Sequence, residues 1–276
     1  MEAVEKIIDK LRDFRENSSR DPEALRDIWP NLDAIERKLS VEEKWTVIEQ
    51  FCMAGIDMHD EDIIQSCLLR LKRQFPGSKR VSLLEVMASC ELKGKYDEAI
   101  RRYDQIIEDD ETNTGARKRK IAVLLSQNKN VEAIKELCEY LKIFMNDQEA
   151  WKELSELYML EQDYQKAIFC MEELLLSHPL SSTYHTRLAE MYYTLGTHES
   201  LEQARSYYSK ALKLSDTNVR ALQGFHLTLQ RLINNFKLTA QQRNELEKLD
   251  SWTISTLNSI YDKDGNPDVA KFMKIN

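Results

Sequence analysis

The feature that most constrains this chain is a sequence pattern that recurs every 34 residues. Ala99, Ala133 and Ala167 are spaced 34 residues apart, and each is followed by an apolar residue and a segment of helical length. A period of this size is typical of stacked helical hairpins, because one pair of helices cannot cover its own apolar face and must share a core with its neighbours. Only seven glycines and five prolines interrupt the 276 residues, which also favours helices. We therefore expect an all-α chain.

The repeat can be numbered by placing these alanines at position 20, which starts successive copies at Arg80, Thr114, Gln148 and Ser182. A small side chain is expected at position 20 because two antiparallel helices approach closely there. The copy at Gln148 matches the tetratricopeptide pattern through Trp151, Leu154, Tyr158, Tyr164, Ala167 and Pro179. The pattern predicts a tetratricopeptide repeat α-solenoid, a right-handed superhelix of helical hairpins with helical caps.

The organisation along the chain follows from where the pattern holds and where it fades. We expect an N-terminal helical cap at 1–44, a repeat array at 45–235, a C-terminal capping helix at 236–262 and a tail at 263–276. Repeats are expected to start near 45, 80, 114, 148, 182 and 219. In the copy at 182 the alanine shifts to Ala204, because about three extra residues lengthen the preceding turn. The capping helix is expected to pack through Leu246, Leu249, Trp252, Ile254, Leu257 and Ile260.

Charge and cysteine content narrow the class of protein. The formal net charge is −8, from 47 acidic and 39 basic residues, which disfavours nonspecific binding to nucleic acid or to an anionic bilayer. No stretch approaches the roughly 18 consecutive apolar residues of a membrane span, and the N-terminus lacks the apolar segment of a signal peptide. The five cysteines form no CxxC pair, so we expect a reducing compartment and thiols that pack in the core.

The residue groupings that catalysis or cofactor binding would need are not found in the sequence. No two glycines lie closer than Gly77 and Gly94, which excludes a glycine-rich phosphate loop. The five histidines show no metal-ligand spacing, and no nucleophile, base and orienting group recur together. We expect a protein that is not an enzyme and that has no catalytic residues, no metal site and no cofactor.

The expected recognition surface is the first helix of each repeat, at positions 2, 5, 9 and 12. In the copy at Arg80 these positions include Val81, Leu84 and Ala88. Across later copies the lining mixes apolar and charged side chains, which suits a broad protein segment. The partner-binding residues that we predict are Arg117, Lys118, Arg119, Lys120, Lys152, Glu156, Met159, Glu190 and Tyr193.

The basic run Arg117–Lys120 departs from the pattern, because Arg117 and Lys120 occupy positions that usually hold Trp and Leu. Two interpretations stay open. Either the aliphatic stems cover the core while the charges reach solvent, or the run docks an acidic segment of a partner.

Several longer strings resemble one family within the tetratricopeptide class. They are Arg73–Ser78, Thr112–Thr114, Ala116–Ala122, Asn130–Ile134, Asp147–Trp151, Glu153–Leu154, Glu156–Tyr158, Ala211–Leu214 and Arg220–Leu222. The chain resembles subunit 2 of the endoplasmic reticulum membrane protein complex over about residues 45 to 230. It departs from the family in the segment from Ser18 to Lys44 and in a short tail after Tyr261.

The resemblance implies a non-catalytic cytosolic scaffold that is peripheral on the cytoplasmic face of the endoplasmic reticulum membrane. Family members bind cytosolic portions of membrane-spanning subunits and a soluble partner subunit. The whole complex inserts tail-anchored and polytopic membrane proteins. Two alternatives stay open: a free cytosolic tetratricopeptide adaptor of another assembly, and an RNA-binding helical repeat protein that uses the run Arg117–Lys120. One basic run in an acidic chain does not favour RNA binding.

Overall fold

The computed structural model describes residues 2–17 and 19–263, and every regular element in those residues is a helix. The elements divide into two compact units, 1–136 and 137–276, and the helix α9 crosses the boundary. The predicted tail at 263–276 lies outside the described residues, apart from Lys263 at the end of the last helix. The all-α prediction is confirmed, while the predicted domain boundaries stay a prediction.

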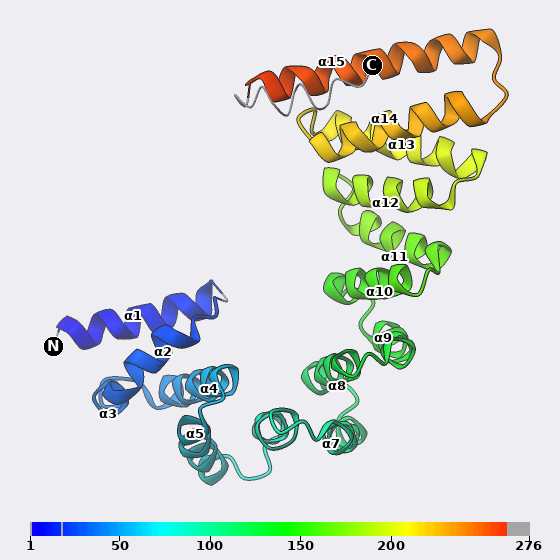
Figure 1. Ribbon diagram of the computed structural model, residues 1–276. Coiled ribbons are helices and arrows are strands. Elements are labelled where there is room, and N and C mark those ends of the chain that lie inside the picture. Colours follow the sequence, from blue (N-terminus) through cyan, green and yellow to red (C-terminus); the bar gives the residue numbers. More distant parts are fainter. Residues whose placement is uncertain (1, 18, 264–276) are drawn as a thin grey trace. The chain divides into compact units, whose positions relative to one another are not determined.

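The first unit contains α1 (Glu2–Glu16), α2 (Pro22–Ile28), η1 (Trp29–Asn31), α3 (Leu32–Glu36), α4 (Val41–Met58), α5 (Glu61–Gln74), α6 (Lys79–Val86), η2 (Met87–Glu91), α7 (Tyr96–Asp109) and α8 (Thr114–Ser126). Then comes α9 (Asn130–Ile143). The second unit continues with α10 (Gln148–Leu160), α11 (Tyr164–Ser177), α12 (Ser182–Leu195), α13 (His198–Leu214), α14 (Val219–Asn235) and α15 (Ala240–Lys263). In Figure 1 the helices α10 to α14 of this unit are stacked one after another as antiparallel neighbours.

The helices begin at residues whose side chains cap them. Asn113, Asp147, Ser181 and Asn218 precede the first helices of successive repeats, and each accepts a hydrogen bond from a backbone N–H three residues on. Such caps satisfy donors that a helix leaves without intrahelical partners. They therefore fix the start of each hairpin at the place that the repeat register predicts.

The turn between the two helices of each hairpin is left-handed at the same repeat position. Position 15 of the copies near 45, 80, 114, 148 and 182 has φ between 57° and 72°, at His59, Gly94, Asn128, Gln162 and Gly196. Only two of the five are glycine, the residue that adopts this conformation without steric cost. The repeat therefore adopts the left-handed turn even where the residue is not glycine and the positive φ is sterically unfavourable.

The alanines at position 20 lie where the helices of a hairpin meet. Ala99, Ala133, Ala167 and the shifted Ala204 are all 0% exposed. This confirms the predicted register, including the displacement in the copy at 182. Around them, one core of the first unit joins α1 to α6 and a second joins α6 to α8, while the cores of the second unit join α10 to α13 and α12 to α15.

The first helix of the copy at Arg80 contains a π turn, η2. Its backbone bond runs from Leu92 N to Met87 O, five residues back. The helix starts at Lys79, one residue earlier than in the next three copies, yet it ends at the same left-handed turn. A π turn accommodates one inserted residue inside a helix, so η2 absorbs the extra residue.

Part of the expected recognition surface in this copy is buried. Val81, Leu84 and Ala88 are 7%, 3% and 7% exposed, and they belong to the core that also contains α4 and α5. These side chains are therefore largely covered, because α6 packs against α5 of the preceding hairpin. Val81 and Leu84 still line a groove of about 450 Å³ together with Trp45 of α4, so partner binding at these positions stays a prediction.

The cysteines lie where the sequence suggests, since Cys52, Cys67, Cys90 and Cys170 are buried and Cys138 is half-buried. Burial raises the pKa of Cys52 and of Cys67 to about 12. A thiol with such a pKa is unreactive near neutral pH, which agrees with a packing role.

The capping helix α15 packs through a different set of residues from the one predicted. Leu246 and Leu257 are buried as expected, but Trp252 is 49% exposed, so its predicted place in the core is wrong. Asp250 and Thr253 are buried instead. The cause is a polar contact that hydrophobic periodicity cannot reveal.

That contact joins α14 to α15. Asp250 Oδ1 lies 2.6 Å from His226 Nδ1, and Asp250 Oδ2 accepts a hydrogen bond from Gln230 Nε2 at 2.7 Å. The ring nitrogen is the donor, because a carboxylate oxygen can only accept. Both carboxylate oxygens are thereby satisfied, which allows Asp250 to be buried.

Candidate functional site

The basic run on α8 is largely occupied by contacts within the first unit. The guanidinium of Arg119 binds the carboxylate of Glu91, and Lys120 Nζ lies 2.7 Å from Asp104 Oδ1 and 2.7 Å from Glu136 Oε1. Arg117 Nε donates to the carbonyl of Glu111 at 2.9 Å. One interpretation of the run was that the aliphatic stems cover the core while the charges reach solvent. That interpretation did not include these ion pairs. Partner binding by the run stays a prediction.

The π turn η2 positions the carboxylate that holds Arg119. Glu91 is its last residue, and it accepts hydrogen bonds from Arg119 on α8 and from the hydroxyl of Tyr103 on α7. Burial raises the pKa of Tyr103, and the bond to Glu91 raises it further. Burial alone would lower the pKa of Arg119, but the bonds to Glu91 outweigh it and raise that pKa. This cluster therefore joins η2, α7 and α8 through hydrogen bonds to the carboxylate of Glu91.

Lys120 is held in the same way. Its side chain is only 13% exposed. Burial would lower the pKa of Lys120, but the hydrogen bonds to Asp104 and Glu136 together raise it above its usual value. A lysine in place of the leucine that the repeat prefers is thus tolerated, because two carboxylates neutralise it.

Most of the predicted residues in the second unit gather in one groove between α10 and α12. The groove has a volume of about 410 Å³. Lys152, Glu156 and Met159 line it from α10, and Glu190 lines it from α12. Tyr193 is not part of the lining, since its ring packs against Arg231 at 5.1 Å.

Several residues of this groove were not predicted from the sequence. Arg187 and Tyr184 on α12 line it, and Met171 and Met191 are also part of the lining. Arg187 Nη1 lies 3.6 Å from Glu190, which also binds Arg220 Nη2 at 2.8 Å. Arg187 occupies position 6 of the copy at Ser182, so the positions 2, 5, 9 and 12 do not include it.

The chemistry of the groove suits a protein segment better than a small molecule. Cations and carboxylates alternate along its edges, and methionines form part of its wall. Methionine side chains are flexible and adapt to irregular apolar surfaces. A segment with side chains of both signs and apolar anchors would match this lining.

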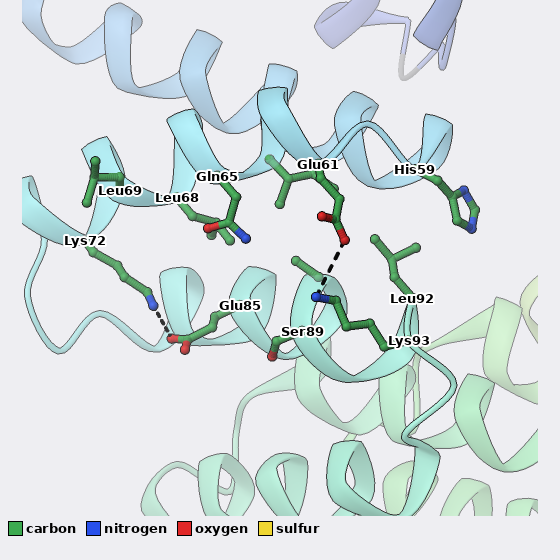
Figure 2. Close-up of a pocket in the computed structure, with 12 residues that line it drawn as sticks. His59, Glu61, Gln65, Leu68, Leu69, Lys72, Glu85, Ser89, Leu92 and Lys93 are labelled. Atoms are coloured by element: carbon green, nitrogen blue, oxygen red, sulfur yellow. Dashed lines mark ion pairs between the residues drawn. The ribbon is translucent and has the colours of Figure 1, made fainter.

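A second cavity lies in the first unit, between α5 and the helix formed by α6 and η2. Figure 2 shows two ion pairs across it, Lys72 with Glu85 at 2.8 Å and Lys93 with Glu61 at 3.6 Å. Its volume is about 260 Å³, and Leu68, Leu69 and Leu92 supply apolar lining. Pockets for small ligands usually start near about 300 Å³. This cavity is smaller than that.

Neither a metal centre nor a membrane span is found in the described stretches. Within 2–17 and 19–263, no three His, Cys, Asp or Glu side chains gather as they would around a metal ion. Over those same residues, no helix is both long and apolar enough to cross a bilayer.

The hairpins, the small residue at position 20 and the left-handed turn at position 15 define a tetratricopeptide repeat protein. A family profile described as the EMC2 TPR-like repeat domain matches residues 75–207. The chain is 42% identical over 257 residues to ER membrane protein complex subunit 2 of Xenopus tropicalis, covering 93% of this chain and 86% of that protein. It belongs to the family of ER membrane protein complex subunit 2.

More distant similarities accompany this one. TPR repeat protein oca3 of Schizosaccharomyces pombe is 28% identical over 210 residues, covering 75% of this chain and 72% of that protein. Among solved structures, a crystal structure of MamA protein aligns with a TM-score of 0.49 at 18% identity, covering 67% of this chain and 94% of that one.

Proposed function

We propose that this chain is a non-catalytic scaffold subunit of the ER membrane protein complex. It sits on the cytoplasmic face of the endoplasmic reticulum membrane as a peripheral subunit. There it organises the cytoplasmic part of an insertase for tail-anchored and polytopic membrane proteins. The observation that carries the proposal is the 42% identity to the Xenopus tropicalis subunit along 93% of the chain.

Its partners are other subunits of the complex, namely cytosolic portions of membrane-spanning subunits and a soluble partner subunit. The groove between α10 and α12 holds a segment of one of them. Lys152 and Arg187 would face carboxylates of that segment, while Glu156 and Glu190 would face its cations. Met159 would contact an apolar anchor, and Tyr193 lies farther along α12.

The basic run is a second proposed contact. Lys118 is exposed on α8, and Arg117 is half-buried beside it. An acidic partner segment would add charge-assisted hydrogen bonds there. Because Arg119 and Lys120 already tie helices together, reversal of Arg117 and Lys118 to Glu tests the contact with less damage to the fold.

The test is purification of the tagged full chain from cells in a gentle detergent, with identification of the bound proteins by mass spectrometry. We expect membrane-spanning and soluble subunits of the complex, retained after nuclease treatment. Glu156→Lys and Met159→Ser should each reduce recovery of a subset of subunits. Glu245→Lys on α15 makes the same charge change as Glu156→Lys outside the groove, and it should leave recovery unchanged.

Two results would contradict the proposal in different ways. Recovery of no membrane-spanning subunit, together with loss of the chain from membrane fractions, would favour a free adaptor of another assembly. Normal recovery by the groove variants would leave the scaffold role intact and remove the groove from it.

A further inference from the structure

A second groove lies on the other helices of the same repeats, between α11 and α13. Its volume is about 550 Å³, and Phe169, Leu175, Leu176, Pro179 and Tyr207 form its apolar lining. Phe169 is 54% exposed and Leu176 is 77% exposed. Leu180, which directly follows Pro179, is 80% exposed. Clustered apolar side chains of this size at the surface usually mark a contact with another molecule.

The repeat itself shows that these exposed side chains are exceptional. Phe169 and Leu176 occupy positions 22 and 29 of the copy at Gln148. The same positions hold Arg101 and Glu108 in the copy at Arg80. In the copy at Thr114 they hold Lys135 and Lys142. All of these equivalents are exposed, so the position faces solvent in each repeat and packing does not require an apolar residue there.

The charged lining of the groove has one sign. Glu172 and Glu173 lie on α11 between Phe169 and Leu176, and no Lys or Arg is among the lining residues. Residues three, four and seven apart share one face of a helix, so the carboxylates and the apolar side chains form a single stripe. Glu172 also accepts a hydrogen bond from the hydroxyl of Tyr192 at 3.0 Å, which fixes its position.

The other side chains with polar atoms around this groove are already engaged within the second unit. His185 is 7% exposed, and its Nε2 donates to the carbonyl of Pro179 at 2.9 Å. The ring of Tyr207 stacks on Tyr192 with centroids 5.6 Å apart and carries the ammonium of Lys210 at 4.7 Å from its centroid, so Glu172 and Glu173 are the groups that would receive a partner's cations.

We infer that the groove between α11 and α13 docks a segment of a partner protein in which apolar side chains alternate with Lys or Arg. The apolar side chains cover Phe169 and Leu176, and the cations pair with Glu172 and Glu173. An anionic bilayer is the poorer match for the same apolar surface, because those carboxylates would face lipid headgroups of the same sign. This surface lies outside the groove between α10 and α12 and does not depend on its role.

The test measures binding of short fluorescent peptides to the full chain by anisotropy. One peptide alternates Leu and Lys, a second alternates Leu and Glu, and a third alternates Ser and Lys. The Leu and Lys peptide should bind saturably, and each of the other two should bind at least about tenfold more weakly. Equal binding of the Ser and Lys peptide would show attraction to the net negative charge alone and would overturn the inference.

Variants locate the site. Leu176→Ser and Glu173→Lys should each weaken the Leu and Lys peptide by about tenfold, and Glu173→Lys should strengthen the Leu and Glu peptide. The control Glu245→Lys makes the same change in net charge on α15 and should alter affinity less than about twofold. Circular dichroism should show unchanged helicity in all three variants, since the altered side chains are exposed or at the rim.

Co-sedimentation with vesicles rich in phosphatidylserine tests whether the groove binds an anionic bilayer instead. We expect that the full chain does not sediment with these vesicles. Sedimentation that Leu176→Ser abolishes would assign the patch to a membrane surface and overturn the inference, as would wild-type affinity of Glu173→Lys for the Leu and Lys peptide.

Discussion

Gly224 on α14 gives the sharpest test of how the second unit is packed. A Cβ placed on Gly224 would lie 2.3 Å from Cζ and 2.4 Å from Oη of Tyr208 on α13. Non-bonded carbon atoms normally stay about 3.5–4.0 Å apart, so the overlap with Cζ exceeds about 1 Å. The Tyr208 ring is 2% exposed and shares a core with Ala211 and Leu222, which are fully buried, so it cannot move freely.

Gly224→Ala should therefore destabilise the fold, whereas the same substitution in a helix usually stabilises it. Replacing glycine by alanine inside a helix normally stabilises it by about 1 kcal/mol. Overpacking of a core costs about 1–3 kcal/mol, and an overlap this large places Gly224→Ala near the upper end. The net loss should be about 2 kcal/mol, which lowers the melting temperature by about 4–8 °C.

A double-mutant cycle with Tyr208→Leu isolates the contact. Removing the ring opens the space that the new methyl group needs, so Gly224→Ala should become neutral or stabilising in that background. Thermal unfolding followed by circular dichroism measures all four proteins. If Gly224→Ala destabilises both backgrounds equally, the approach of α14 to α13 at this position is not the cause.

Three further predictions follow from the turns, the thiols and the first helix. Gln162→Gly should stabilise by up to about 1 kcal/mol, since glycine relieves the left-handed backbone at φ 61°; a lower melting temperature would contradict that. With iodoacetamide at pH 8, half-buried Cys138 should react before Cys52, whose pKa of about 12 leaves almost no thiolate, and mass spectrometry of the labelled peptides reads the order. A hydrogen bond from Arg12 lowers the pKa of Glu43, so its contribution to stability is complete above the unfolded pKa of about 4.3 and is lost as pH falls through the lower folded value; Glu43→Gln should flatten that part of an acid titration followed by circular dichroism.

The repeat register was predictable because it depends on one kind of contact. Each alanine at position 20 faces a closely packed helix, and the sequence shows that requirement directly. The turn at position 15 was only partly visible, since Gly94 and Gly196 announce a left-handed backbone whereas Asn128 and Gln162 do not. The same two backbone bonds close the first helix at Gly94, Asn128 and Gln162, so the helix end sets the turn whatever the residue type.

Buried polar contacts between helices were the part of the fold that could not be predicted from the sequence. Hydrophobic spacing placed Trp252 in the core of α15, but Asp250 is buried there because His226 and Gln230 on another helix satisfy both of its oxygens. Similarly, the carboxylate that binds Arg119 belongs to Glu91, which the π turn positions. Partners distant in sequence decide these contacts, so no local pattern reports them.

Residues that depart from the repeat pattern therefore differ in their cause, and the contacts in the structure distinguish the two kinds. Lys120 stands where the pattern prefers leucine, but Asp104 and Glu136 neutralise it within the first unit, so its departure is explained by contacts inside the chain. Phe169 and Leu176 depart in the opposite direction, because apolar side chains replace charged ones at positions that face solvent. Burying them against another protein would release the water that covers them, at about 25 cal/mol per Å² of apolar surface. The exposed apolar side chains of α11 therefore lower the free energy only when a partner covers them. This makes the α11 face a stronger candidate for partner binding than the basic run on α8.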